Sequence, residues 1–259
     1  MLKNRYVGIG FIILIASAVF LLYALKIGQF DGFANKPVEQ ATSISSEKTN
    51  EKKILTMMEA LRLGYEEVKK YTEEEPLLID LTSTDDTTVP QGKTDGADGK
   101  RNAWNLQFGS KKGNINIDLY IKDGKVDARV SKDNNNLLRK GQYAVSDIKI
   151  DSPEAIKKAI EVLGIRPGDP EIKDDWIKGY HFSIMGFLTD PNSSETRYLL
   201  RIMGISPNSP NSENDSLRMT VFFDVKTGEM VNASEMIGYD KDGRTDWKEV
   251  ELKRTLGNK

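Results

Sequence analysis

Apolar and polar residues follow three patterns along the chain, and each pattern predicts a different element. The first is an uninterrupted apolar run: residues 6–25 read YVGIGFIILIASAVFLLYAL and carry no charge. In a helix that rises about 1.5 Å per residue, this run spans roughly 30 Å, the thickness of one bilayer core. Twelve of its twenty residues are Leu, Ile, Phe or Val, and their insertion contributes roughly −4 to −7 kcal/mol. The run predicts a transmembrane helix.

Residues 6–25 fit two kinds of targeting segment. A cleaved secretory signal has a basic start, a short apolar core and a cleavage triplet of small residues. Lys3 and Arg5 supply the basic start, and residues 16–18 (Ala-Ser-Ala) supply a triplet. The apolar run continues beyond that triplet, which favours an uncleaved signal-anchor. Because basic flanks stay in the cytoplasm, we expect residues 1–5 inside and the C-terminal part outside the cell.

The second pattern is a helical stripe that follows a polar stretch. Residues 26–50 are expected to form a flexible stalk, because so polar a composition cannot bury enough surface to fold. Over residues 51–71 apolar side chains return with a 4-3-4-3 spacing, which is one face of an amphipathic helix. The side chains expected to be buried are Ile54, Met58, Leu61, Tyr65 and Val68.

The third pattern has a period of two, which is typical of half-buried antiparallel strands. Asp123-Gly124 lies between two such runs and predicts a type I′ hairpin turn, because glycine tolerates the positive φ that this turn needs. Strands are expected over residues 77–81, 104–108, 115–121 and 126–130.

The same succession of helix and strands returns after the polar residues 131–141. Asp151 or Ser152 caps a helix, Pro153 suits its first turn and Gly164 its end. Its expected buried face is Ile156, Ala159, Ile160 and Leu163. Further strands are expected over residues 180–184, 197–205, 217–225 and 229–231, and residues 247–252 form either a strand or a helical turn.

These elements predict an α+β fold: an N-terminal transmembrane helix followed by two helix-on-antiparallel-sheet units. A helix cannot bury its stripe alone, and a strand meander cannot cover its own apolar face, so each half forms a natural two-layer unit. The predicted units are residues 51–141 and residues 142–259. A single composite α+β domain is the alternative arrangement.

Two segments of the second unit carry a family resemblance. The helix opens with residues 152–155 (Ser-Pro-Glu-Ala), and the hairpin at residues 223–231 reads FDVKTGEMV. This pattern, a capped helix and a closing D-x-x-T-G-E-hydrophobic hairpin, resembles PepSY-like domains of bacterial envelope proteins over about residues 152–233. The first unit departs from the pattern, with Asp-Gly in place of Thr-Gly. The resemblance implies an extracytoplasmic, non-catalytic module that regulates a protease or mediates interactions, and it assigns no site residues.

Composition excludes several classes of function. The chain has no cysteine, so disulfides, thiolate metal sites and cysteine nucleophiles are not expected. Its formal net charge is −2. Nucleic acid is therefore not expected as a partner, because binding phosphates requires clustered Lys and Arg.

The sequence offers few residues for chemistry, and we predict no catalytic, cofactor-binding or metal-binding residue. The single histidine, His181, has no nucleophile motif near it and is expected to be an ordinary strand residue rather than a general base. Residues 240–243 and 95–99 resemble a calcium loop faintly, but their glycines are misplaced for an EF-hand. Residues 174–176 (Asp-Asp-Trp) contain ingredients of a sugar cleft, yet adjacent acids do not flank a bond.

The expected function follows from an anchor, a stalk and sheet modules without a catalytic constellation. We expect a membrane-anchored, extracytoplasmic binding or regulatory module that works through an unidentified envelope protein. Exposed strand edges are the expected docking sites, because an unpaired edge accepts an added strand. The alternatives are a module that binds cell-wall glycan and an envelope hydrolase.

Overall fold

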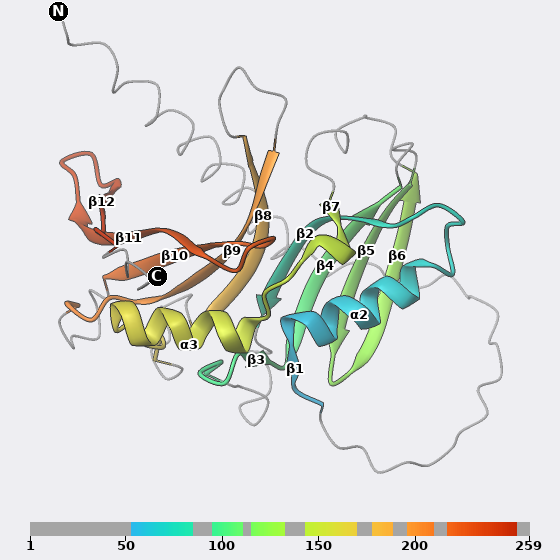
Figure 1. The fold of residues 1–259 in the computed structure, drawn as a ribbon, viewed down its shortest axis with the longest axis horizontal. Coiled ribbons are helices and arrows are strands. Elements are labelled where there is room, and N and C mark those ends of the chain that lie inside the picture. Colours follow the sequence, from blue (N-terminus) through green and yellow to red (C-terminus); the bar gives the residue numbers. More distant parts are fainter. Residues whose placement is uncertain are drawn as a thin grey trace, which may run out of the picture. The chain divides into compact units, whose positions relative to one another are not determined.

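A ten-stranded antiparallel sheet with two helices is the main body of the protein (Figure 1). The computed structural model describes residues 53–84, 95–110, 115–132, 143–169, 178–188, 196–209 and 217–252. The α+β class predicted from the sequence is confirmed. Asn50–Lys259 form one compact unit.

Some sequence predictions fall outside the described residues. These are the anchor at residues 6–25, the stalk at residues 26–50 and the boundary between residues 141 and 142. Within the described ranges, neither helix has the length and apolar character needed to cross a bilayer.

The helices are α2 (Met57–Val68) and α3 (Ser152–Leu163), with a short 3-10 turn η3 (Val145–Asp147) before α3. The strands of the first half are β1 (Leu55–Thr56), β2 (Leu77–Thr84), β3 (Lys100–Arg101), β4 (Ala103–Gly109), β5 (Ile115–Lys122) and β6 (Lys125–Lys132). Those of the second half are β7 (Tyr143–Ala144), β8 (His181–Leu188), β9 (Thr196–Ile205), β10 (Arg218–Asp224), β11 (Met230–Tyr239) and β12 (Thr245–Glu249).

The sheet runs without interruption through both halves of the sequence, in the order β12-β11-β10-β9-β8-β2-β4-β5-β6. The join is the antiparallel pair of β2 with β8, where Leu81 lies opposite Ile184 and Thr82 opposite Ser183. Strand β7 pairs with the start of β2 at Leu77 and Leu78. The strands predicted for the two units therefore lie side by side in one sheet.

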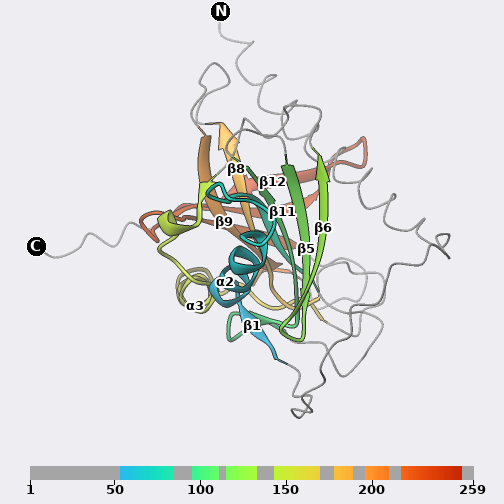
Figure 2. The ribbon, with the colours of Figure 1, turned by 90° about the vertical axis from the view of Figure 1, so that its right-hand side faces the viewer.

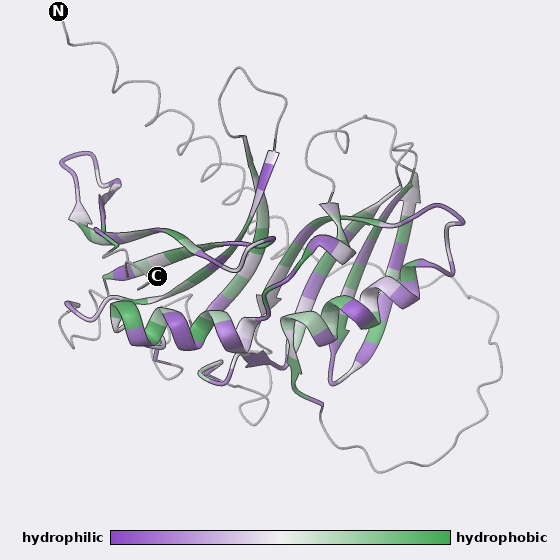
Figure 3. Cartoon of the chain, in the orientation of Figure 1, coloured by the Kyte–Doolittle hydropathy of each residue, from purple (hydrophilic) through white to green (hydrophobic). Residues whose placement is uncertain are grey.

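Both helices pack against the same face of this sheet (Figures 1 and 2). The alternation predicted from the sequence is confirmed: Ile117, Leu119 and Ile121 of β5 are buried, while Tyr120 between them is exposed. Figure 3 shows hydrophilic and hydrophobic residues interspersed along both the helices and the strands. The predicted turn is also confirmed, since Asp123 and Gly124 have φ values of 53° and 73°.

Helix α2 is shorter than the predicted 51–71 because a capping box sets its start. The Thr56 side chain accepts a hydrogen bond from the Glu59 N–H at 3.2 Å, and the Glu59 carboxylate accepts one from the Thr56 N–H at 2.9 Å. Such a box satisfies two backbone donors that the helix itself leaves free. Ile54 therefore precedes the helix, and its side chain is exposed.

The buried face of α2 also differs from the predicted stripe. Leu61 and Val68 of the predicted stripe are buried, and Met58 and Tyr65 pack against the core from half-buried positions. A side chain at Gly64 would meet Leu106 and Leu119 at 2.9 and 3.0 Å, which shows how closely the helix backbone approaches the sheet there. The buried face is Met57, Ala60, Leu61, Gly64 and Val68.

Helix α3 has the predicted bounds and caps. Its N-cap is Asp151, whose carboxylate accepts the Ser152 N–H at 2.7 Å, and it ends at Gly164 with a φ of 66°. Ile160 is exposed, contrary to the prediction, while Leu163 packs against the core from a half-buried position.

The first turns of the two helices meet at the Ser152 hydroxyl, which is buried. This hydroxyl accepts a hydrogen bond from the Met57 N–H at 2.9 Å and donates one to the Gly99 carbonyl at 2.6 Å. Asp151 adds a second link, since its carboxylate accepts the Met58 N–H at 2.9 Å. Donors at the start of α2 are thus satisfied by residues about 95 positions later in the chain.

Candidate binding surface

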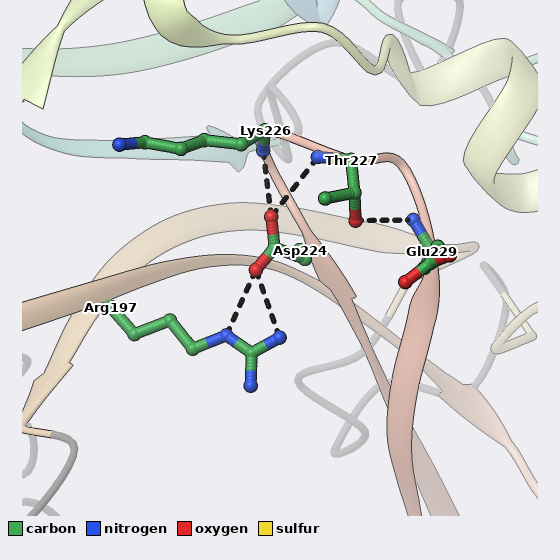
Figure 4. Close-up of polar contacts among 5 residues, drawn as sticks. All are labelled: Arg197, Asp224, Lys226, Thr227 and Glu229. Carbon is green, nitrogen blue, oxygen red and sulfur yellow. Dashed lines mark hydrogen bonds and ion pairs between the residues drawn. The ribbon is translucent and has the colours of Figure 1, made fainter.

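The hairpin that carries the PepSY resemblance is organised by the carboxylate of Asp224 (Figure 4). One oxygen accepts the N–H groups of Lys226 and Thr227 at 2.9 and 3.1 Å. The other oxygen accepts a hydrogen bond from Nε of Arg197 at 2.9 Å and forms an ion pair with the guanidinium group of that residue. The Thr227 hydroxyl in turn accepts the Glu229 N–H at 3.2 Å.

These contacts show what the hairpin side chains do. Partial burial raises the pKa of Asp224, but the N–H donors of Thr227 and Lys226 together with Arg197 outweigh it, and the pKa lies below its usual value. The motif therefore uses its polar atoms to hold the turn and the neighbouring strand, which is a structural role.

A second group of polar side chains lies on the sheet face opposite the helices. Because side chains alternate along a strand, the register of β2, β8 and β9 directs Asp80, His181, Ser183 and Arg201 to that face. Arg201 donates from Nε to the Ser183 hydroxyl at 3.0 Å. All of these side chains except Ser183, which is buried, are half-buried.

Burial shifts the titration of two of these groups in opposite directions. Desolvation raises the pKa of Asp80 to about 6, although the positive charge of Arg201 lowers it in part. Desolvation lowers the pKa of His181 to about 3, and the charges of Arg101 and Arg201 lower it further. His181 is therefore neutral at pH 7, in the strand where the sequence placed it.

Apolar side chains surround Arg201 on the same face. The rings of Phe187 and Phe222 meet edge to face with centroids 5.6 Å apart, and Phe187 is 37% exposed. Phe222 lies opposite Arg201 in the ladder, and Met185 lies opposite Leu199. We call these residues the β8–β10 patch: Met185, Phe187, Leu199, Arg201 and Phe222.

The chain matches no protein-family model, no curated protein and no solved structure. The PepSY resemblance therefore stays a prediction.

The other sequence candidates for chemistry lie in ordinary turns. The carboxylate of Asp240 accepts the N–H groups of Asp242 and Arg244, both at 2.8 Å. Asp95 and Asp98 accept N–H groups within their own turn in the same way. In the described ranges no three His, Asp or Glu side chains are grouped as metal ligands. Residues 174–176 lie outside those ranges.

The members of the β8–β10 patch and their neighbour Asp80 were not among the functional residues predicted from the sequence. One signal was present: Asp80 and Arg201 are charged residues with apolar neighbours on both sides in the sequence, where an unpaired charge is costly. Their proximity depends on the pairing of β2 with β8, which no local pattern reveals.

The pH dependence of stability separates the contributions of Asp80 and His181. The folded-state pKa of Asp80, about 6, lies above its ordinary 3.8, so its contribution to stability falls as the pH rises from about 4 to about 6. The folded-state pKa of His181, about 3, lies below 6.5, so its contribution is lost as the pH falls from about 6.5 to about 3.

Asp80→Asn should remove the pH-dependent contribution of Asp80 to stability and leave that of His181. We expect the stability of this variant relative to the wild type to rise by roughly 2–3 kcal/mol between pH 4 and pH 7. Urea unfolding of both proteins at the two pH values measures this difference. A difference that is the same at both pH values would show that Asp80 is not the group that titrates.

Proposed function

We propose that this protein is a membrane-anchored, extracytoplasmic module that binds an envelope protein and regulates it without catalysis. The observation that carries the proposal is the β8–β10 patch, which lies on the sheet face opposite α2 and α3. Aromatic residues and arginine are the side chains that contribute most to protein interfaces. The apolar run at residues 6–25 supports the membrane anchor.

The composition of the patch favours a protein partner. Its apolar side chains, Met185, Phe187, Leu199 and Phe222, offer a surface against which a partner's apolar side chain loses its contact with water. The Arg197–Asp224 ion pair borders this surface and is part-exposed, as expected for the polar rim of an interface. The patch would thus supply both an apolar centre and a charged border.

The test compares two substitutions of equally exposed residues on one face of the sheet. Phe187 in the patch and Tyr120 on β5 are each 37% exposed, and both side chains point away from the helices. Chemical cross-linking in intact membranes, followed by quantitative mass spectrometry, measures recovery of envelope proteins. We expect Phe187→Asp to reduce recovery of the specific partner by about tenfold or more, while Tyr120→Asp leaves it unchanged.

Two controls make this experiment decisive. A tag at the C-terminus should be digested by protease added to intact cells, and a shielded tag would overturn the proposed topology. Equal recovery with both variants would refute the patch as the docking surface. Capture of the protein by purified wall material, lost in Phe187→Asp, would instead support the alternative of a glycan-binding module.

A further inference from the structure

Strand β6 forms one edge of the sheet, and in the described ranges it pairs with β5 alone. Its ladder with β5 is regular from Lys122 and Lys125 at the turn to Ile115 and Lys132 at the far end. The strand at the other edge, β12, is shorter, and its ladder with β11 is irregular near Met236. Short or bulged edges resist pairing with another strand, and β6 has neither protection.

The hairpin turn decides which backbone groups of β6 point outward. In a hairpin with a two-residue turn, the residues that flank the turn exchange both of their hydrogen bonds, and the pattern then alternates. Lys122 and Lys125 flank the turn, so Lys125, Asp127 and Arg129 bond to β5. The N–H and C=O groups of the residues between them point away from the sheet: Val126, Ala128 and Val130.

The side chains of β6 divide between the two faces. Val126 and Ala128 lie on the helix side, opposite the buried Ile121 and Leu119, and are half-buried. Val130 lies on the same side but is 44% exposed. Lys125, Asp127 and Arg129 lie on the other face, with Asp127 two residues before Arg129.

This arrangement of charges is self-complementary in an antiparallel register centred on Ala128. In that register Asp127 of each copy lies directly opposite Arg129 of the other copy, and Val126 lies opposite Val130. Opposite charges and β-branched residues that face each other both stabilise a strand pair. Arg129 already lies opposite Asp118 within its own chain, so each arginine would lie between two carboxylates.

The neighbouring registers are less favourable. Centring the pair on Asp127 or on Arg129 places two like charges directly opposite each other, which is destabilising. Centring it on Val130 pairs Arg129 with a serine. Centring it on Val126 matches Lys125 with Asp127, but this register reaches the turn at Gly124 after two residues.

We propose that two copies of this chain associate through their β6 edges, antiparallel and with Ala128 opposite Ala128 of the second copy. The six outward backbone groups of each copy then form about six hydrogen bonds. Val130 loses much of its exposure against Val126 of the second copy. The partner is a second copy of this chain, so the association goes beyond binding of an envelope protein and can be tested with purified protein.

Cysteine cross-linking tests the register, because the chain has no cysteine of its own. In the proposed dimer the two Ala128 Cα atoms lie about 5.5 Å apart, within the range of a disulfide. The two copies of Val126 lie roughly 14 Å apart, and so do the two copies of Val130. In full-length protein in detergent, A128C should cross-link on mild oxidation, whereas V126C and V130C should do so only when mixed.

The outcomes of this experiment distinguish the registers. Failure of A128C to cross-link would overturn the proposal. Cross-linking of V126C or V130C with itself would overturn the register, since each would then lie on the two-fold axis.

Charge reversal provides an independent test that does not depend on cysteine chemistry. R129D places aspartates opposite each other and should raise the dimer dissociation constant by about tenfold or more. The double variant D127R/R129D restores opposite charges and should restore most of the association. K248D reverses a positive charge on the other edge strand, as R129D does on β6, and should have no effect. Analytical ultracentrifugation measures the dimer dissociation constant of each variant. A double variant that dimerises no more tightly than R129D would overturn the proposed pairing.

Discussion

Gly99→Ala is expected to lower the free energy of unfolding by roughly 3–5 kcal/mol, a large share of the 5–15 kcal/mol typical of a folded protein. Gly99 has a φ of 76°, which L side chains rarely adopt. A methyl group there would lie 2.6 Å from the Ser152 carbonyl carbon and closer still to the backbone of Pro153. Because the atoms it meets are backbone atoms of the first turn of α3, no side-chain rotation relieves the overlap.

A matched variant separates the steric cost from the conformational cost. Gly243 has nearly the same φ, 73°, but nothing lies within 4 Å of a methyl group built on it. Gly243→Ala should therefore cost only about 1 kcal/mol. Denaturant unfolding of the full-length protein in detergent measures both changes. If the two variants were equally stable, the close contact between Gly99 and the start of α3 would not exist.

Ser152→Ala is expected to lower the free energy of unfolding by about 2–4 kcal/mol, because it removes one hydroxyl that serves two buried groups. The Met57 N–H loses its acceptor and the Gly99 carbonyl loses its donor. A buried group left without a partner costs about 1–3 kcal/mol. Since the hydroxyl joins residues from both halves of the sequence, amide hydrogen exchange should accelerate in β4 and in β9 alike.

The control is another serine that donates to a backbone carbonyl. The Ser131 hydroxyl lies 3.4 Å from the Asn116 carbonyl, but this contact is exposed. Ser131→Ala should change stability by less than about 0.5 kcal/mol. A similarly small effect of Ser152→Ala would mean that water replaces the hydroxyl, and the link between the helix starts would then contribute little.

The sequence predicted most elements because their signals are local. Strands β4 and β5 alternate as expected, and α3 is capped by Asp151, one of the two residues expected to do so. The face of α2 was predicted only in part, because Gly64 contributes to it through close approach of the backbone rather than through an apolar side chain. A buried glycine cannot be recognised from the pattern of hydrophobic residues, because it has no apolar side chain.

The pairings between strands that are distant in the sequence could not be predicted from local patterns. Residues 247–252 fitted a strand or a helical turn, and pairing with β11 decides for strand β12 at Thr245–Glu249. The β8–β10 patch likewise depends on which strand lies beside β8 and β9. The residues of the patch carry no unusual local spacing, so their position on one surface appears only when the ladders are known.

The pairing of β2 with β8 has a consequence for the nascent chain during its synthesis on the ribosome. Strand β8 is synthesised about 100 residues after β2, and at 5–20 residues per second translation of that interval takes roughly 5–20 s. Throughout it, Leu81 and its neighbours can pair with β4 but lack β8 on their other side, and such open strand edges are prone to aggregate. A chaperone should therefore bind nascent chains that end before residue 181, and release them once β8 has emerged.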